Sequence, residues 1–324
     1  MLTKRRNFMK KLLLGFIIAA ALFSVTGCKE KKNYILATGG TSGTYYAFGG
    51  VLANLWNTKI ENMNVTAQST GASAENLRLI NKGDAEYAIV QNDVMDYAYN
   101  GTDMFDGTKL SNIASIGTLY PEVVQIAASK DSGIKSVADM RGKRVSVGDA
   151  GSGVEFNVKQ IFEGYGMTFD DIKKNNLSFK ESAEGIQNGT LDACFVTAGV
   201  PNAALQELAF TAGLVLIPVT GPEADAIMAK YGYYTKTVIP GGTYKGTDTD
   251  TEALAIKATL AVNKNLDEDT VYEMTKAIFD NLYELGSSHA KGREISAESA
   301  ITGVSVPFHP GAVKYYKEIG LSVN

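Results

Sequence analysis

The strongest constraint on the fold of this chain is a short pattern that occurs twice, at residues 80–91 and 186–197. The two segments read INKGDAEYAIVQ and IQNGTLDACFVT. In each segment a helix end is followed by a glycine, an acidic residue and an apolar strand that closes on a polar side chain. The recurrence predicts two units of similar construction.

The similarity extends upstream of both segments. About forty residues earlier each copy has another apolar strand, at 35–38 and at 144–148, followed by a turn rich in glycine and then a helix. Alternating strands and helices predict a mostly parallel α/β sheet, with ligands beyond the carboxyl ends of the strands. We therefore expect an α/β protein of two lobes whose glycine turns face each other across a cleft.

Strands that fit neither copy mark the places where the chain crosses between the lobes. One is the apolar segment 123–129, and the other is the extended stretch 238–242, which contains a proline and two glycines. A hinge at these crossings makes the first lobe discontinuous. The expected ranges are 34–128 plus 241–324 for the first lobe and 129–240 for the second.

The glycine turns suit an anionic ligand. A helix N-terminus has unpaired N–H groups and a partial positive charge, and glycine lets the backbone approach a ligand closely. A further turn from strand to helix, at 197–202, could bind an anion in the same way. We expect a small carboxylate or amino acid to be held by residues of these turns and of the strand end at 91–93: Thr38, Gly40, Thr41, Ser42, Gly43, Thr44, Tyr45, Gln91, Asp93, Gly151, Ser152, Gly153, Thr197 and Asn202.

Each of these residues also has a structural alternative. Serine, threonine and asparagine at such turns cap helices, and glycine alone can make the turn. Asp93 in particular is placed to cap the helix that follows it. Enzyme motifs are absent from the same glycines, because neither a phosphate-binding G-x-x-x-x-G-K-S/T loop nor a G-x-S-x-G nucleophile turn occurs.

The first residues have the layout of an export signal. Five basic residues precede an apolar run of about fourteen residues at 12–25, which is too short to span a membrane. The small residues before Cys28 resemble a bacterial lipobox. We expect residues 1–27 to be a lipoprotein signal peptide, Cys28 to carry lipid, and residues 28–33 to tether the protein to a membrane. A free or disulfide-bonded Cys28, and twin-arginine export, are the alternatives.

The acidic composition excludes nucleic acid as the expected partner. Without the five basic residues of the signal, 26 basic residues face 35 acidic ones, a formal charge of −9. The remaining cysteine, Cys194, lies in an apolar strand and reads as a core residue. With His289 and His309 the only histidines, no Cys/His metal site can be composed, and we expect neither a metal nor a cofactor.

Several motifs together resemble the TAXI family of solute receptors, which serve one class of TRAP transporters. They are TGGTSGTYY at 38–46, Gly83 with QND at 91–93, RGKRVSVG at 141–148 with GSG at 151–153, and PFHPGA at 307–312 with two tyrosines at 315–316. The likeness runs from about residue 34 to the end of the chain. Asp149 in the second turn is a departure, because an acidic residue is unexpected beside a site for an anion. It is placed to meet an amino group of the ligand instead.

This resemblance implies a two-lobed type II periplasmic-binding-protein fold with a hinge and a ligand cleft between the lobes. It further implies capture of glutamate, glutamine or a related acid and delivery to TRAP membrane permease subunits. We expect a monomer that is no enzyme. The alternatives are a receptor for an ATP-driven importer or a sensor kinase, an enzyme that uses Cys194, and a surface antigen without a small ligand.

Overall fold

The computed structural model describes residues 31–323, so the predicted signal peptide and Cys28 lie outside the described residues. Its strands are β1 (Lys32–Ala37), β2 (Met63–Gln68), β3 (Tyr87–Gln91), β4 (Ile113–Ala128), β5 (Arg144–Ser146), β6 (Lys173–Asn175), β7 (Ala193–Ala198), β8 (Val215–Leu216), β9 (Thr235–Ile239) and β10 (Thr251–Asn263).

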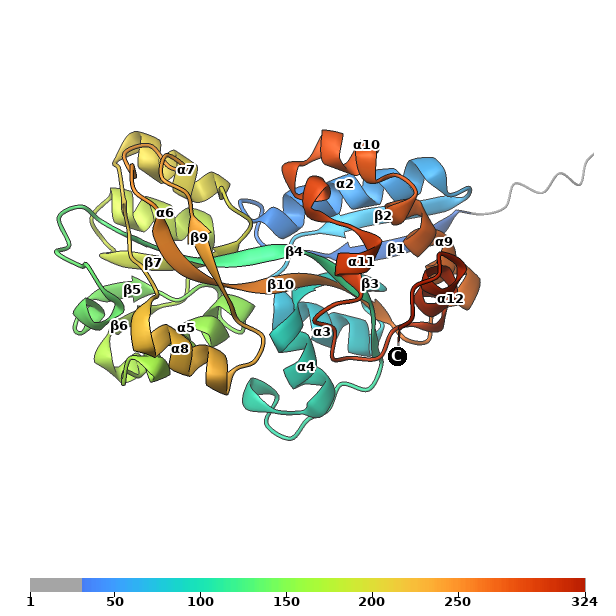
Figure 1. Cartoon of the computed structure of the whole chain (residues 1–324), viewed down its shortest axis with the longest axis horizontal. Coiled ribbons are helices and arrows are strands. Elements are labelled where there is room, and N and C mark those ends of the chain that lie inside the picture. Colours follow the sequence, from blue (N-terminus) through green and yellow to red (C-terminus); the bar gives the residue numbers. More distant parts are fainter. Residues whose placement is uncertain (1–30, 324) are drawn as a thin grey trace, which may run out of the picture. The chain divides into compact units, whose positions relative to one another are not determined.

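The helices alternate with these strands over most of the chain (Figure 1). They are α2 (Thr44–Lys59), α3 (Ser73–Lys82), α4 (Asn92–Asn100), α5 (Gly153–Gly164), α6 (Phe179–Gln187), α7 (Ala203–Thr211), α8 (Gly221–Lys230), α9 (Glu268–Phe279), α10 (Leu282–Ser288), α11 (Ala297–Ala300) and α12 (Pro310–Glu318), with short 3₁₀ turns η1 (Asp103–Phe105), η2 (Val137–Met140), η3 (Phe169–Asp171) and η4 (Ala290–Glu294). Within the described part, no helix has the length and apolarity needed to cross a bilayer.

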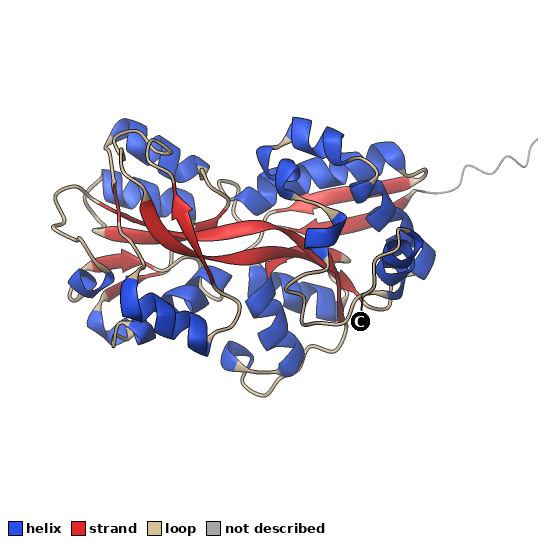
Figure 2. Cartoon of the chain, viewed as in Figure 1, coloured by secondary structure: helices blue, strands red, loops and turns tan. Residues whose placement is uncertain are grey.

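One sheet runs through both lobes, with the order β2-β1-β3-β10-β4-β7-β5-β6. This path of eight strands is symmetric about the central antiparallel pair β10 and β4, with three strands on each side. Off the path, β8 pairs with β4 and β9 pairs with β10, both antiparallel. The pairs β1/β3, β5/β7 and β5/β6 are parallel, as the alternation of strands and helices predicts. Helices cover both faces of the sheet in each lobe (Figure 2).

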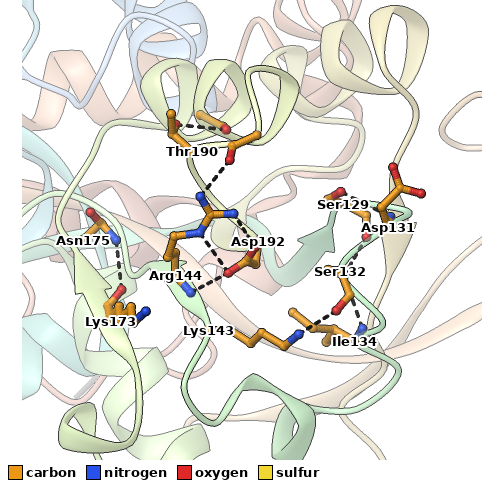
Figure 3. Close-up of polar contacts among 12 residues, drawn as sticks. Ser129, Asp131, Ser132, Ile134, Lys143, Arg144, Lys173, Asn175, Thr190 and Asp192 are labelled. Atoms are coloured by element: carbon orange, nitrogen blue, oxygen red, sulfur yellow. Dashed lines mark hydrogen bonds and ion pairs between the residues drawn. The ribbon is translucent and has the colours of Figure 1, made fainter.

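The repeated sequence pattern is a repeated structural device. In the first lobe the Glu86 carboxylate accepts from the backbone N–H of Ile35 at 2.7 Å, and in the second lobe Asp192 accepts from the N–H of Arg144 at 2.7 Å. Both acids thereby join the first parallel strand of a lobe to the strand that follows the glycine. Figure 3 shows the second copy, in which the Arg144 guanidinium also binds Asp192. The two glycines of the pattern have φ of +83° and +70°, which side chains disfavour.

Two sets of apolar side chains form the cores of the lobes, and β4 and β10 contribute to both. In β4 the core changes after Tyr120, whose ring packs edge to face on Phe48 of the first lobe, while Val124 packs in the second lobe. In β10 the change lies between Ile256 and Ala258. We therefore propose crossings near residues 121 and 257.

The second crossing differs from the one expected at 238–242. The proline and glycines there end β9 and begin the loop that leads into β10, and the two strands pair antiparallel with Ile239 opposite Thr251. Residues 241–256, which the sequence assigned to the first lobe, thus pack largely with the second, where Tyr244 and Leu254 are buried. A strand of this length reaches through both lobes, since each residue adds about 3.3 Å.

We predict that Asp192→Asn lowers the free energy of unfolding by about 1.5–3 kcal/mol at pH 7, because charge-assisted hydrogen bonds hold β5 to β7 there. The Arg144 side chain and backbone lower the pKa of Asp192, so this stabilisation is present above the unfolded pKa and is lost as pH falls through the folded pKa. Chemical denaturation at pH 7 and below pH 3 checks it. Asp84→Asn, in an exposed pair with Lys82, is the control and should change little. Equal losses in both variants would contradict the prediction.

Candidate functional site

A pocket of about 40 Å³ lies where the two lobes meet. A single water needs about 10–15 Å³ on such a measure, so the pocket takes a few small groups. Both lobes and the crossing strand β4 line it: Gly39, Gly40, Gly43, Thr44, Tyr45, Ala72, Ser73, Gln91, Glu122, Asp149, Ser152, Gly153, Val154, Phe179, Thr197 and Ala198.

The structure brings together residues predicted from all the expected turns. Those of the predicted set that line the pocket are Gly40, Gly43, Thr44, Tyr45, Gln91, Ser152, Gly153 and Thr197. In the repeat, Gln91 at the end of β3 corresponds to Thr197, one residue before the end of β7, and the two reach the pocket from opposite lobes. Their role in ligand binding stays a prediction, but the convergence of the turns is now a feature of the fold.

Two predicted ligand residues are engaged elsewhere. Thr38 is fully buried, and its hydroxyl donates to the carbonyl of Gln68 at 2.6 Å, which ties β1 to β2. Asp93 lies in the first turn of α4 behind the pocket wall, where its carboxylate accepts from the N–H of Val94 at 2.8 Å. It is not the N-cap, since that residue is Gln91. Neither side chain lines the pocket. Thr38 is hydrogen-bonded within the first lobe, and Asp93 is hydrogen-bonded both within that lobe and to Asn157 of the second lobe.

The other predicted residues outside the pocket are held in a helix cap or a turn, or are exposed. Asn202 is the N-cap of α7 and accepts from the N–H groups of Ala204 and Leu205, while its Nδ2 donates to the carbonyl of Ser42 at 3.2 Å. Thr41 is exposed, and the N–H of Gly151 donates to the Glu155 carboxylate. These contacts fit the structural alternative, capping and turn formation, and a role of these residues in ligand binding stays a prediction.

Two helices point uncapped N-termini at the pocket. The N-cap positions of α2 and α3 are Gly43 and Ala72, and neither supplies a side-chain oxygen to the first turn. Their backbone N–H groups are therefore open to a ligand with negative charge. Ala72 has φ 71° and ψ −145°, a conformation that costs a residue with a side chain about 1–3 kcal/mol. Strain of this kind in the pocket wall is typical of a binding site.

The most unusual residue of the pocket is Glu122, which the sequence reasoning missed. It is 1 % exposed and accepts a hydrogen bond from the hydroxyl of Tyr45 at 2.5 Å. Burial raises the pKa of Glu122 to about 8, against which the Tyr45 bond acts in the opposite direction. A signal existed, because Glu122 is the only charged residue among the sixteen of β4.

Asp149 is the second acid of the pocket. Burial raises the pKa of its carboxyl, and the nearby carboxylate of Glu181 adds to the shift. Neither lysine nor arginine lines the pocket among the described residues. The pocket thus offers helix N-termini to an anionic group, and it offers one buried and one half-buried carboxyl to an ammonium or another hydrogen-bond donor. The remaining missed residues, Gly39, Ala72, Ser73, Val154, Phe179 and Ala198, supply backbone, small side chains and one aromatic wall.

Direct contacts join the lobes around the pocket. The N–H of Gly199 in the second lobe donates to the Thr44 hydroxyl of the first at 3.1 Å. Gly153, at the start of α5, lies so close to Gln91 that a β-carbon on it would stand 2.2 Å from the amide oxygen Oε1. That oxygen is buried and has no hydrogen-bond partner among the described residues. The described structure is therefore a closed arrangement with a free acceptor next to the pocket.

Two other kinds of site, a cysteine nucleophile and a metal site, find little support in the described residues. Burial raises the pKa of Cys194 to about 12, and a thiol that stays protonated is a poor nucleophile. Over residues 31–323, no three or more His, Cys, Asp or Glu side chains are grouped so as to hold a metal ion.

Comparisons with known proteins agree on the fold. Residues 36–320 match the sequence profile of the NMT1-like family. Similar solved structures include a binding protein component of an ABC phosphonate transporter from Pseudomonas aeruginosa, at 14% identity and TM-score 0.54 over 82% of this chain and 80% of that one. PhnD1 from Prochlorococcus marinus in complex with methylphosphonate has 10% identity and TM-score 0.54 over 89% and 98%.

A putative L-cystine ABC transporter protein from Listeria monocytogenes has 12% identity and TM-score 0.52, over 83% of this chain and 98% of that one. Identities this low establish a shared fold and nothing further. The fold is the two-lobed α/β fold of periplasmic binding proteins, as the repeat and the family resemblance predicted.

We predict that Gly153→Ala blocks closure, because the added methyl group would overlap Gln91, which is buried and cannot swing away without losing its bond to Asn157. Radius of gyration from X-ray scattering should rise, with little change in the melting temperature of either lobe. Gly50→Ala in α2 is the matched control, since nothing lies within 4 Å of its β-carbon. A compact Gly153→Ala protein would show that the lobes tolerate the overlap.

We predict that Glu122→Gln stabilises the protein at pH 9 and leaves it unchanged near pH 4. The pKa of the buried acid is about 8 in the folded state and about 4.5 when unfolded, so the wild type loses stability as pH rises between these values. At about 1.4 kcal/mol per pKa unit, the variant's free energy of unfolding at pH 9 should exceed that of the wild type by at most about 5 kcal/mol. Chemical denaturation of both proteins from pH 4 to 9 measures this difference. If the free energies of unfolding of the two proteins change with pH in parallel, Glu122 is not the group that titrates.

Proposed function

Because the chain belongs to the NMT1-like family, we propose that it is an extracytoplasmic solute-binding receptor, which captures a small ligand between its lobes and delivers it to a membrane importer. The observation that carries the proposal is the convergence of equivalent turns and strand ends from both lobes on one closed pocket. Fold alone would not carry it, since many activities share a fold.

Capture follows from the two crossing strands. An open form exposes the N-termini of α2 and α3 on the first lobe, and bending of β4 and β10 brings the start of α5 against the same ligand. A ligand favours the closed form only as far as it binds that form better. Micromolar affinity needs about 8 kcal/mol in total, which a few charge-assisted hydrogen bonds of about 1.5–3 kcal/mol supply after ordering costs.

The importer is the finer part of the proposal. Neighbours that are described as components of ABC transporters support an ATP-driven importer, which was the alternative in the sequence analysis. The motif resemblance to TAXI receptors supports a TRAP permease, and we rank it second. An ATPase gene beside this one would favour the first partner. A gene for a large multi-span permease with a small membrane subunit would favour the second.

The ligand we propose is a small carboxylate or amino acid, with glutamate and glutamine as the first candidates from the family resemblance. Open N–H groups of α2 and α3 suit its carboxylate, and Glu122 or Asp149 suits an ammonium group. Binding without catalysis is sufficient, and Cys194 offers no accessible nucleophile. We also propose export and a lipid anchor at Cys28, which rest on the sequence of residues 1–28 alone.

A thermal-shift screen followed by calorimetry tests the receptor proposal. The panel contains amino acids, dicarboxylates, L-cystine and methylphosphonate, the last two taken from the ligands named for similar structures. We expect at least one amino acid or carboxylate to raise the melting temperature and to bind with one site. If every compound leaves the melting temperature unchanged, the proposed ligand class is wrong. If methylphosphonate alone raises it, the ligand class is phosphonates and not carboxylates or amino acids.

A further inference from the structure

Asn157 in α5 has the most complete set of polar contacts in the interface between the lobes. Its Nδ2 donates to the carboxylate of Asp93 at 3.3 Å and to the hydroxyl of Tyr234 at 2.9 Å. Its Oδ1 accepts from Gln91 Nε2 at 3.2 Å and from the Thr197 hydroxyl at 2.9 Å. A carboxamide has two donor hydrogens and two acceptor positions, so every one is used. The residue is fully buried.

The partners of Asn157 come from both lobes. Gln91 and Asp93 belong to the end of β3 and the start of α4 in the first lobe, whereas Thr197 and Tyr234 belong to the second. Gln91 and Thr197 are also the equivalent strand-end residues of the repeat, and both line the pocket. Asn157 itself does not line the pocket. One amide therefore joins the two corresponding faces of the pocket from behind.

The packing of α5 against α4 fixes the position of the Asn157 amide. Gly153, Phe156, Asn157 and Gln160 follow one face of α5 at helical spacing and meet α4 of the other lobe. The ring of Phe156 stacks on Tyr97 with centroids 6.0 Å apart, and Gln160 Nε2 donates to the Tyr97 hydroxyl at 2.9 Å. Figure 1 shows α4 and α5 on the same side of the sheet, one in each lobe. The packing holds the Asn157 side chain in one orientation.

We propose that Asn157 is an interlobe clasp, a positioning residue that holds Gln91 and Thr197 in register and keeps the lobes closed. The proposal rests on the receptor function in one respect, namely that the lobes open and close. Opening breaks the bonds of Asn157 to Gln91 and Asp93 and leaves those to Thr197 and Tyr234. The clasp therefore biases closure without contact to the bound solute.

Asp93 makes the clasp sensitive to protons. Burial raises the pKa of its carboxyl to about 7, so a closed form that buries it holds a proton which an open, hydrated form releases. Closure should therefore weaken as pH rises toward 7 from the lower pKa of the hydrated carboxyl, and it should level off above 7. The titratable and charged groups around it on the packed elements are Tyr97 of α4, Asp103 of η1 with its partner Lys159, Glu122 of β4, and Tyr233 and Tyr234 of the second lobe.

Hydrogen exchange of the Gly199 amide tests the clasp without any solute. This N–H is held by the Thr44 hydroxyl across the cleft, so its protection reports closure. In Asn157→Ala we expect Gly199 to exchange at least ten-fold faster. Ser182→Ala, which removes a buried hydroxyl bond to Ser146 within the second lobe, is the control and should leave Gly199 protection unchanged. Equal protection in Asn157→Ala and wild type would overturn the clasp.

A second variant keeps the test valid if Asn157→Ala does not fold. Asn157→Asp preserves the shape but places a second carboxyl against Asp93, so Gly199 protection, corrected for intrinsic exchange, should fall more steeply between pH 5 and 8 than in wild type. In Asp93→Asn the pH dependence over that range should be weaker than in wild type, with Glu122 still titrating there. A role confined to the stability of the second lobe predicts the same pH dependence in wild type, Asn157→Asp and Asp93→Asn, and equal dependence in all three would reject the clasp. A failed solute screen would leave these readouts intact.

Discussion

The antiparallel pair of β4 and β10 is the constraint on which the rest of the structure depends. Both strands pass through the two cores, so the lobes share one sheet, and along the main strand order three strands follow on each side of this pair. The symmetry of the strand order places equivalent strand ends opposite each other. Because ligand sites in such sheets lie beyond the carboxyl ends of parallel strands, one pocket with two similar walls follows from the topology.

Polar groups are buried around this pocket at a cost that a stable core would avoid. Glu122 and Asp93 are acids in an apolar interior, with pKa values raised to about 8 and about 7, and Ala72 has a strained backbone. Unpaired or half-paired polar groups inside a protein cost about 1–3 kcal/mol each. Their concentration between two lobes fits an interface that opens and closes. There Asn157 is fully satisfied, and the adjacent Gln91 oxygen has no partner within residues 31–323.

Much of the fold was predictable because its signals are local. A glycine after a helix, an acid three residues later and an apolar strand recur at 83–91 and 189–197. The recurrence is explained by the hydrogen bonds that the carboxylates of Glu86 and Asp192 accept from backbone N–H groups of the neighbouring strand. The second crossing that we propose, near residue 257, differs from the expected one because Pro240 and its glycines indicate a turn without telling on which side of the hinge it lies. Of the candidate site, the glycine turns were found by composition. Glu122 was missed because a single acid within an apolar strand carries no periodic signal.

The sequence by itself determined the α/β alternation, the two similar units and the turns that open helix N-termini, since these depend on residues within about ten positions of one another. Only the tertiary structure decided which turn residues face the pocket. In it, Thr38 bonds within its own lobe, and Asn202 caps α7 and reaches across to Ser42 of the other lobe. It also decided that Asn157 meets partners 64 and 77 positions away in the chain. The physical reason is that a hydrogen bond depends on where the side chains lie in space, and the packing of α5 against α4 sets that across the hinge.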